Sequence, residues 1–232
     1  IEKFIEFEEN KLVINPDYYS INKDNSSAVT LKNINFKYFN SDKLIFNNLD
    51  LSFPKGEHTV LTGPNGSGKS TLLGIICQIY YPEQGEVSLR TEKIGYVGVT
   101  PLIVDGSLRE NLLYGNKSKE ISDDEMKEML KKFKLFDDDN YDLSFVISNR
   151  TLSSGQMQKI SFIRALLANT EILLLDESTS NLDSQTRELI FSILEKQDIT
   201  IINSTHNHDE FSYDNHVKIE YEGELRNITF VK

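Results

Sequence analysis

A glycine-rich loop between an apolar strand and an apolar helix constrains this chain more than any other feature. The loop runs from Gly63 to Thr71 (GPNGSGKST) and fits the pattern G-x-x-x-x-G-K-[ST]. Its glycines let successive backbone N–H groups point inward, and the N-terminus of the following helix adds positive potential. The strand Thr59–Leu61 and a helix predicted over Thr71–Ile79 supply the context that a phosphate-binding loop requires. An ordinary glycine-rich turn is the weaker alternative.

Every residue of this loop is a candidate contact for a nucleotide's phosphates. We expect the Lys69 ammonium to reach the β- and γ-phosphates and the Ser70 hydroxyl to ligate Mg²⁺. The candidate contacts are Gly63, Pro64, Asn65, Gly66, Ser67, Gly68, Lys69, Ser70 and Thr71.

An apolar run that ends in two acids, Ile172–Glu177, predicts a buried strand whose last residues are functional. In a parallel sheet such a strand ends beside the phosphate loop. We expect Asp176 to hold Mg²⁺ and Glu177 to act as the general base that polarises the attacking water. Taken alone, acids after an apolar strand are common in loops, so the assignment depends on the phosphate loop.

Strands and helices alternate along the chain, which predicts an α/β fold. Continuous apolar runs favour a parallel sheet at Ile94–Val97, Ile172–Leu175 and Ile199–Ile202. Alternating apolar residues predict a pair of strands over Val29–Phe39 and another strand at Leu49–Phe53. Helical spacing of apolar residues predicts helices over Asp123–Phe133, Ser153–Leu167 and Asp183–Leu194.

Composition excludes several classes of protein. A chain of 232 residues can bury a full core as one domain with subdomains. The formal net charge of -11 argues against a nucleic-acid partner, which needs a basic face. No apolar run approaches the roughly 20 residues of a membrane helix. The single cysteine, Cys77, excludes an intrachain disulfide and favours a reducing compartment.

The segment Leu152–Gln156 (LSSGQ) opens the helix predicted from Ser153. Serine is a favoured N-cap, so a capping role is expected in any case. Together with the phosphate loop and the acidic strand end, this segment resembles the nucleotide-binding domain of ABC transporters. The resemblance covers nearly all of Val29–Lys232.

That resemblance implies a P-loop NTPase fold of ABC type, with a parallel-sheet core, an antiparallel β subdomain and a helical subdomain at about 101–169. It assigns the family's signature to Ser153, Ser154, Gly155 and Gln156, with Ser154 in place of the usual glycine. The segment Ser180–Asp183 resembles the loop that helps to join two domains in the family, which makes Asp183 a candidate contact. His206 resembles the histidine that contacts the γ-phosphate, and Tyr38 the aromatic ring that stacks on adenine.

The resemblance further implies an exporter. Val97–Gly115 is similar to the segment that leads into the helical lobe of exporters, and Ile1–Glu9 to the end of a membrane helix. Because the chain begins at Ile1 rather than Met, we expect residues 1–28 to be a linker from a transmembrane domain. The expected protein hydrolyses Mg-ATP at the cytoplasmic face of a membrane, the inner membrane if bacterial, through an ATP-dependent head-to-tail homodimer. The transported substrate and a heterodimer remain open.

Two departures from the family keep other functions open. Val99 stands near the position of a glutamine that ligates Mg²⁺, and a valine side chain has no lone pair to offer a metal. Thr100 is a shorter substitute, and Phe145–Thr151 (FVISNRT) is unlike the charged segment usual in exporters. A domain that binds ATP without turnover is therefore one alternative. A soluble ABC ATPase of DNA repair or translation is another, disfavoured by the acidic composition.

Overall fold

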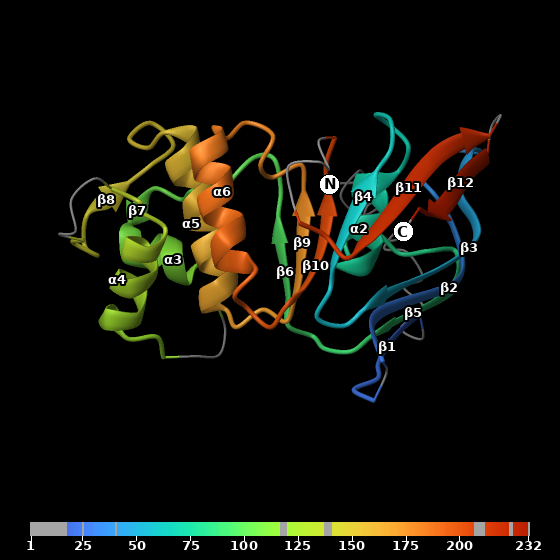
Figure 1. Ribbon diagram of the computed structural model, residues 1–232, viewed down its shortest axis with the longest axis horizontal. Coiled ribbons are helices and arrows are strands. Elements are labelled where there is room, and N and C mark those ends of the chain that lie inside the picture. The colour runs from blue at the N-terminus through green and yellow to red at the C-terminus, as the bar shows by residue number, and fades with distance from the viewer. Residues whose placement is uncertain are drawn as a thin grey trace, which may run out of the picture.

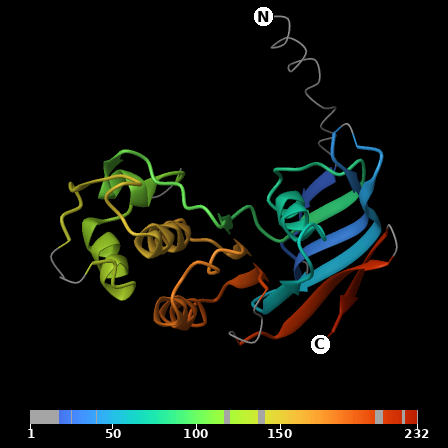
Figure 2. The same cartoon turned by 90° about the horizontal axis from the view of Figure 1, so that it is seen from above.

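The computed structural model describes residues 18–24, 26–39, 41–116, 120–136, 141–206, 212–222 and 225–231. The expected membrane-helix end at Ile1–Glu9 lies outside these residues. Figure 1 shows most of the helices on one side and two sheets with one helix between them on the other, and Figure 2 shows the same division after a quarter turn. Within the described part of the chain, no helix combines the length and the apolar character needed to cross a bilayer.

The larger sheet has six strands in the order β12-β11-β4-β10-β9-β6. All neighbours are parallel except β12, which pairs antiparallel with β11. The strands are β4 (His58–Thr62), β6 (Ile94–Val97), β9 (Ile172–Asp176), β10 (Thr200–Ser204), β11 (Asn215–Glu222) and β12 (Leu225–Phe230). The predicted parallel core is confirmed, and β9 and β10 are buried along their whole length.

The smaller sheet has four strands in the order β1-β5-β2-β3. Its strands are β1 (Tyr19–Ile21), β2 (Ser27–Lys37), β3 (Leu44–Pro54) and β5 (Gln84–Leu89), and β2 pairs antiparallel with both β3 and β5. The prediction of two strands within Val29–Phe39 was wrong, because β2 is a single strand. Its register shifts between Leu31 and Ile34, and such a bulge inserts a residue that breaks the alternation as a turn would.

The smaller sheet also includes residues that precede Val29, the expected start of the domain. β1 pairs parallel with β5 through Tyr19↔Val87, Ser20↔Ser88 and Ile21↔Leu89. The side chain of Tyr19 donates a hydrogen bond to the carbonyl of Ile75. Part of the segment expected to be a linker is therefore a strand of the antiparallel sheet.

Five helices complete the described fold: α2 (Lys69–Ile76), α3 (Leu108–Leu113), α4 (Asp123–Lys132), α5 (Ser154–Leu167) and α6 (Ser184–Leu194). A small sheet of β7 (Gly106–Ser107) and β8 (Val146–Ile147) lies beside α3 and α4 (Figure 1). Helix α2 was predicted to reach Ile79 but ends at Ile76, because Gln78 adopts φ of 63° and the helix cannot continue through it.

The six-stranded sheet separates two apolar cores. Alternate residues of β9 face opposite sides, so Leu173 and Leu175 pack with α5 and α6 while Ile172 and Leu174 pack with α2 and the smaller sheet. This arrangement places the carboxyl ends of β4, β9 and β10 at one edge, since β10 aligns Ser204 with Leu61 of β4 and with Asp176 of β9.

Candidate functional site

The loop between β4 and α2 needs its glycines for the conformation that it adopts. Gly63, Gly66 and Gly68 have φ of 151°, 76° and 109°. A Cβ on Gly63 would lie 2.4 Å from the carbonyl oxygen of Ile219 on β11. The loop therefore lies against the backbone of its neighbouring strand, and a side chain at this glycine would push the two apart.

Lys69, the first residue of α2, folds back over this loop. Its buried ammonium donates to the carbonyls of Gly63 at 2.9 Å and Pro64 at 3.3 Å. Glu177 Oε1 lies 3.8 Å from the same nitrogen. Burial lowers the pKa of Lys69, and the carboxylates of Glu177 and Asp176 oppose that shift. The Lys69 ammonium therefore lies between the carbonyls of the loop and the carboxylate of Glu177.

The Asp176 carboxylate receives a hydroxyl on each oxygen. Ser70 Oγ donates to Oδ1 at 2.9 Å, and the Tyr96 hydroxyl donates to Oδ2 at 2.9 Å. A serine hydroxyl beside a carboxylate is an oxygen set that suits Mg²⁺, which is bound by few protein groups together with phosphates and water. The described residues hold no cluster of three or more acids, histidines or cysteines, so a metal cage built from protein alone is absent from them.

Glu177 and His206 meet just beyond the ends of β9 and β10. His206 Nε2 lies 2.9 Å from Glu177 Oε1. The backbone of Glu177 has φ of 50°, a left-handed conformation that is uncommon outside glycine, and its N–H donates to Ser204 at 2.9 Å. The bend turns the carboxylate toward both His206 and Lys69 instead of along the strand.

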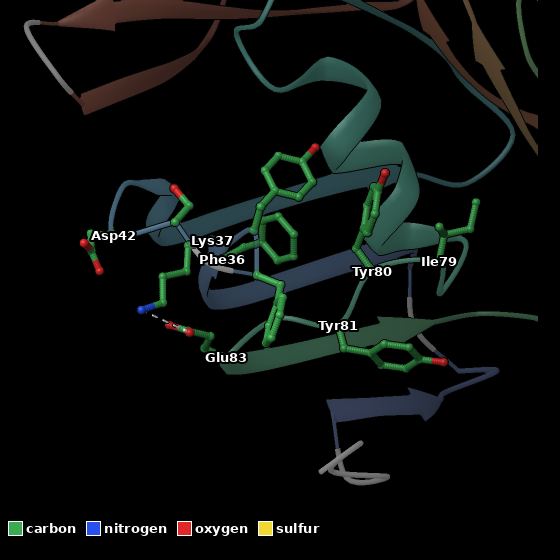
Figure 3. A pocket seen from close by; sticks show the side chains of 10 residues that line it. Phe36, Lys37, Asp42, Ile79, Tyr80, Tyr81 and Glu83 are labelled. Carbon is green, nitrogen blue, oxygen red and sulfur yellow. Dashed lines mark ion pairs between the residues drawn. The ribbon is translucent and has the colours of Figure 1, made fainter. Parts of the chain in front are cut away.

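Tyr38 lies beside the first turn of α2, in an aromatic group. Its hydroxyl is 2.6 Å from Thr71 Oγ1, and its ring makes edge contacts with Phe36 and Tyr80 at 5.2 and 5.5 Å between centroids. These rings border a hollow of about 560 Å³. Figure 3 shows Phe36 and Tyr80 beside it, with Lys37 and Glu83 paired at its edge.

The expected signature residues lie in the other lobe of the molecule, at the start of α5 (Figure 1). Ser153 and Gln156 cap this helix reciprocally, Ser153 Oγ accepting from the Gln156 N–H and Gln156 Oε1 from the Ser153 N–H. Asp183 caps α6 by accepting from the Thr186 N–H, which lowers the pKa of Asp183. Ser154 and Gly155 form the first turn of α5, and a Cβ on Gly155 would lie 3.9 Å from Leu182. The predicted N-cap is confirmed.

Three residues near the site were not among the predicted ones. Tyr96 was read as part of a strand buried on both faces, whereas its side chain is half-exposed and reaches Asp176. Gln158 of α5 is buried and donates to the carbonyl of Gly98, beside the exposed Val99. Arg226 of β12 donates to carbonyls of the phosphate loop. No local pattern marks them, since each acts on a partner distant in sequence.

Comparison with known proteins agrees with this geometry. A family model described as "ABC transporter" matches residues 46–180, which include the loop, Asp176 and Glu177. The chain belongs to the ABC transporter family. It carries that family's ATPase domain, and the predicted ABC-type fold is confirmed.

Individual relatives of this ABC domain are much longer proteins. ABC transporter B family member 18 of Arabidopsis thaliana is 35% identical over 201 residues, 78% of this chain and 16% of that protein. The ATP-dependent permease MDL1 of Candida albicans is 33% identical over 201 residues, 77% of this chain and 29% of that protein. A solved structure titled as a bacterial Atm1-family ABC exporter with ATP bound matches with a TM-score of 0.79 at 22% identity, covering 97% of this chain and 43% of that one.

Proposed function

We propose that this domain binds Mg-ATP on the loop 63–71, hydrolyses it, and so powers export of a substrate across a membrane. The observation that carries the proposal is the convergence of Lys69, Ser70, Asp176, Glu177 and His206 at one edge of the sheet. A cation for phosphate, oxygens for a metal, and a carboxylate with a histidine are the groups that phosphoryl transfer to water requires.

Ser70 and Asp176 fit a magnesium ion. Both are oxygen donors, and they already lie within 2.9 Å of each other. The cation supplies charge neutralisation to the phosphate oxygens when it is bound. Ser67 offers a further polar group for a ligand at the loop. Its hydroxyl is fully buried and has no hydrogen-bond partner among the described residues.

Glu177 is the group that accepts a proton in this proposal. Its carboxylate orients the attacking water, and His206 Nε2 contacts Oε1 of this carboxylate at 2.9 Å. Lys69 balances negative charge near the transferred phosphoryl group. Tyr38, whose hydroxyl lies 2.6 Å from Thr71 Oγ1 in the first turn of α2, supplies an aromatic face for the nucleobase.

Several candidate nucleotide contacts lie away from the phosphate loop of this chain, and they indicate a partner chain. We propose that Ser153, Ser154, Gly155, Gln156 and Asp183 complete the site of a second copy, in an ATP-dependent homodimer. We also propose that a transmembrane domain rests on the groove of about 320 Å³ between the lobes, where Leu102 and Tyr114 are exposed. Such an assembly stands at the cytoplasmic face of a membrane.

Replacing Lys69 by alanine tests the nucleotide site. The variant loses the ammonium at the loop, so we expect binding of a fluorescent ATP analogue to fall by at least ~100-fold, on the scale of a lost charge-assisted contact. Lys93→Ala is the matched control, because Lys93 pairs with Glu171 at 2.7 Å on an exposed surface. Unchanged binding and turnover by Lys69→Ala would refute the assignment.

A further inference from the structure

The hairpin of β11 and β12 runs along the outer side of the phosphate loop, and one arginine of this hairpin contacts the loop directly. Arg226 donates from Nε to the Ser67 carbonyl at 2.7 Å and from an Nη to the Gly66 carbonyl at 3.2 Å. Its other Nη donates to the carbonyls of Leu44 at 3.1 Å and Ile45 at 3.3 Å. We propose that Arg226 is a positioning residue that holds the phosphate loop in its nucleotide-binding conformation. This inference rests on the phosphate site proposed above.

Arg226 fixes the orientation of the peptide between Ser67 and Gly68. In a trans peptide the carbonyl and the following N–H point in opposite directions. Because the Ser67 carbonyl is turned toward Arg226, the N–H of Gly68 is turned away from it. Arg226 thereby sets the direction of an amide in the segment whose N–H groups are to face an anion.

The segment that Arg226 contacts has considerable backbone freedom of its own. Gly66 and Gly68 flank Ser67, and glycines reach many backbone conformations at little cost. Ordering one residue costs about 1–2 kcal/mol of conformational entropy. If the loop is ordered before the ligand binds, this entropy cost does not weaken the binding. An anchor on two consecutive carbonyls supplies such ordering.

Arg226 also links the two ends of the proposed nucleotide site. Leu44 and Ile45 begin β3, directly after the loop that follows Tyr38, so one guanidinium joins the phosphate side to the nucleobase side. The planar fork of an arginine can serve four carbonyls at once, whereas a lysine ammonium has only three protons. The Tyr221 ring, 5.5 Å from the guanidinium carbon, supports it from the side.

Arg226→Met tests this role, because methionine keeps an unbranched stem and removes every donor. We expect the Kd for a fluorescent ATP analogue, and the KM for ATP, to rise about tenfold, the effect of one net hydrogen bond or slightly more. The kcat should stay within about twofold, as for the loss of binding shared by ground and transition states. A merely structural role predicts the reverse, a lower kcat at unchanged KM.

Lys218→Met is the matched control, since Lys218 lies on the same hairpin and pairs with Glu220 at 2.6 Å instead of the loop. Its Kd and KM should equal those of the parent chain. If Arg226→Met does not fold, Arg226→Lys provides the same comparison, with an expected rise in KM of several-fold. Parent-like KM in either folded arginine variant would overturn the inference. A parent chain that binds no ATP would instead overturn the proposed function.

Discussion

Tyr96 is the least expected neighbour of the proposed metal site. Its hydroxyl donates to Asp176 Oδ2, while Val99, where the resemblance led us to expect a glutamine, is exposed and has no donor or acceptor in its side chain. Tyr96 thus contacts Oδ2 of Asp176, whereas Ser70 contacts Oδ1. Asp176 is therefore oriented from both sides without help from Val99.

We predict that Tyr96→Phe weakens the magnesium dependence of nucleotide binding. A hydrogen bond to a charged group contributes about 1.5 kcal/mol or more, so the ratio of Kd values with EDTA and with Mg²⁺ should fall about tenfold or more. Tyr114→Phe is the control, since Tyr114 contacts Arg164 instead of Asp176. An unchanged ratio would show that the phenol is idle. Val99→Gln should raise the same ratio, because it returns an oxygen ligand.

His58, at the start of β4, makes stability depend on pH. Its ring is buried and stacks on Phe191 with an interplanar angle of 8°, and its Nε2 has no hydrogen-bond partner among the described residues. Burial lowers the pKa of His58 to about 4. The folded ring is neutral, whereas the unfolded ring takes up a proton below about pH 6.5. Stability is therefore fully present above about pH 6.5 and falls as the pH decreases toward 4.

We predict that His58→Phe reduces this loss. The depressed pKa corresponds to about 3 kcal/mol of unfolding free energy between pH 6.5 and 4. Urea unfolding of parent and variant should differ at about pH 7 only by the packing change. The difference should move in favour of the variant by a few kcal/mol at about pH 4.5. Parallel pH curves for the two proteins would contradict the prediction.

Among the elements, α5 begins with a cap that serves two purposes in our proposal. The same reciprocal cap opens α4, where Ser122 and Glu125 take the places of Ser153 and Gln156. The two helices therefore offer a comparison in which both have the same reciprocal cap and only the start of α5 is proposed to contact a partner's ATP. A cap at the start of a helix also leaves further N–H groups for an anion.

We predict that Ser153→Ala and Ser122→Ala each lower the free energy of unfolding by about 1 kcal/mol. Only Ser153→Ala should also lower ATPase activity, by more than its effect on stability explains. Chemical denaturation and steady-state turnover measure the two effects. Equal activity of the two variants would leave the signature with a capping role alone.

At the scale of the molecule, the phosphate loop and the capped start of α5 belong to different lobes (Figure 1). In the proposed homodimer, a second chain completes the site that needs both. We propose that ATP favours the paired state over the single one, so that the nucleotide acts as a switch between two assemblies.

We predict that Glu177→Gln binds ATP, loses turnover and elutes as a dimer from a sizing column when Mg-ATP is present. The amide keeps the shape of the side chain and removes its capacity to accept a proton. The double variant Lys69→Ala, Glu177→Gln should elute as a monomer under the same conditions. Parent-like hydrolysis by Glu177→Gln would exclude this residue as the base.

The sequence alone determined the parallel strands, the loop 63–71 and the acids that follow the strand Ile172–Leu175. Periodicity, glycine spacing and strand ends can be read locally because they depend on neighbours in sequence. The bulge in β2 and the early end of α2 escaped prediction, since register and positive φ arise from pairing and packing. Only the tertiary structure decided which distant side chains meet. Tyr96 reaches Asp176 across 80 positions and Arg226 reaches Ser67 across 159, because sheet order brings their strands together.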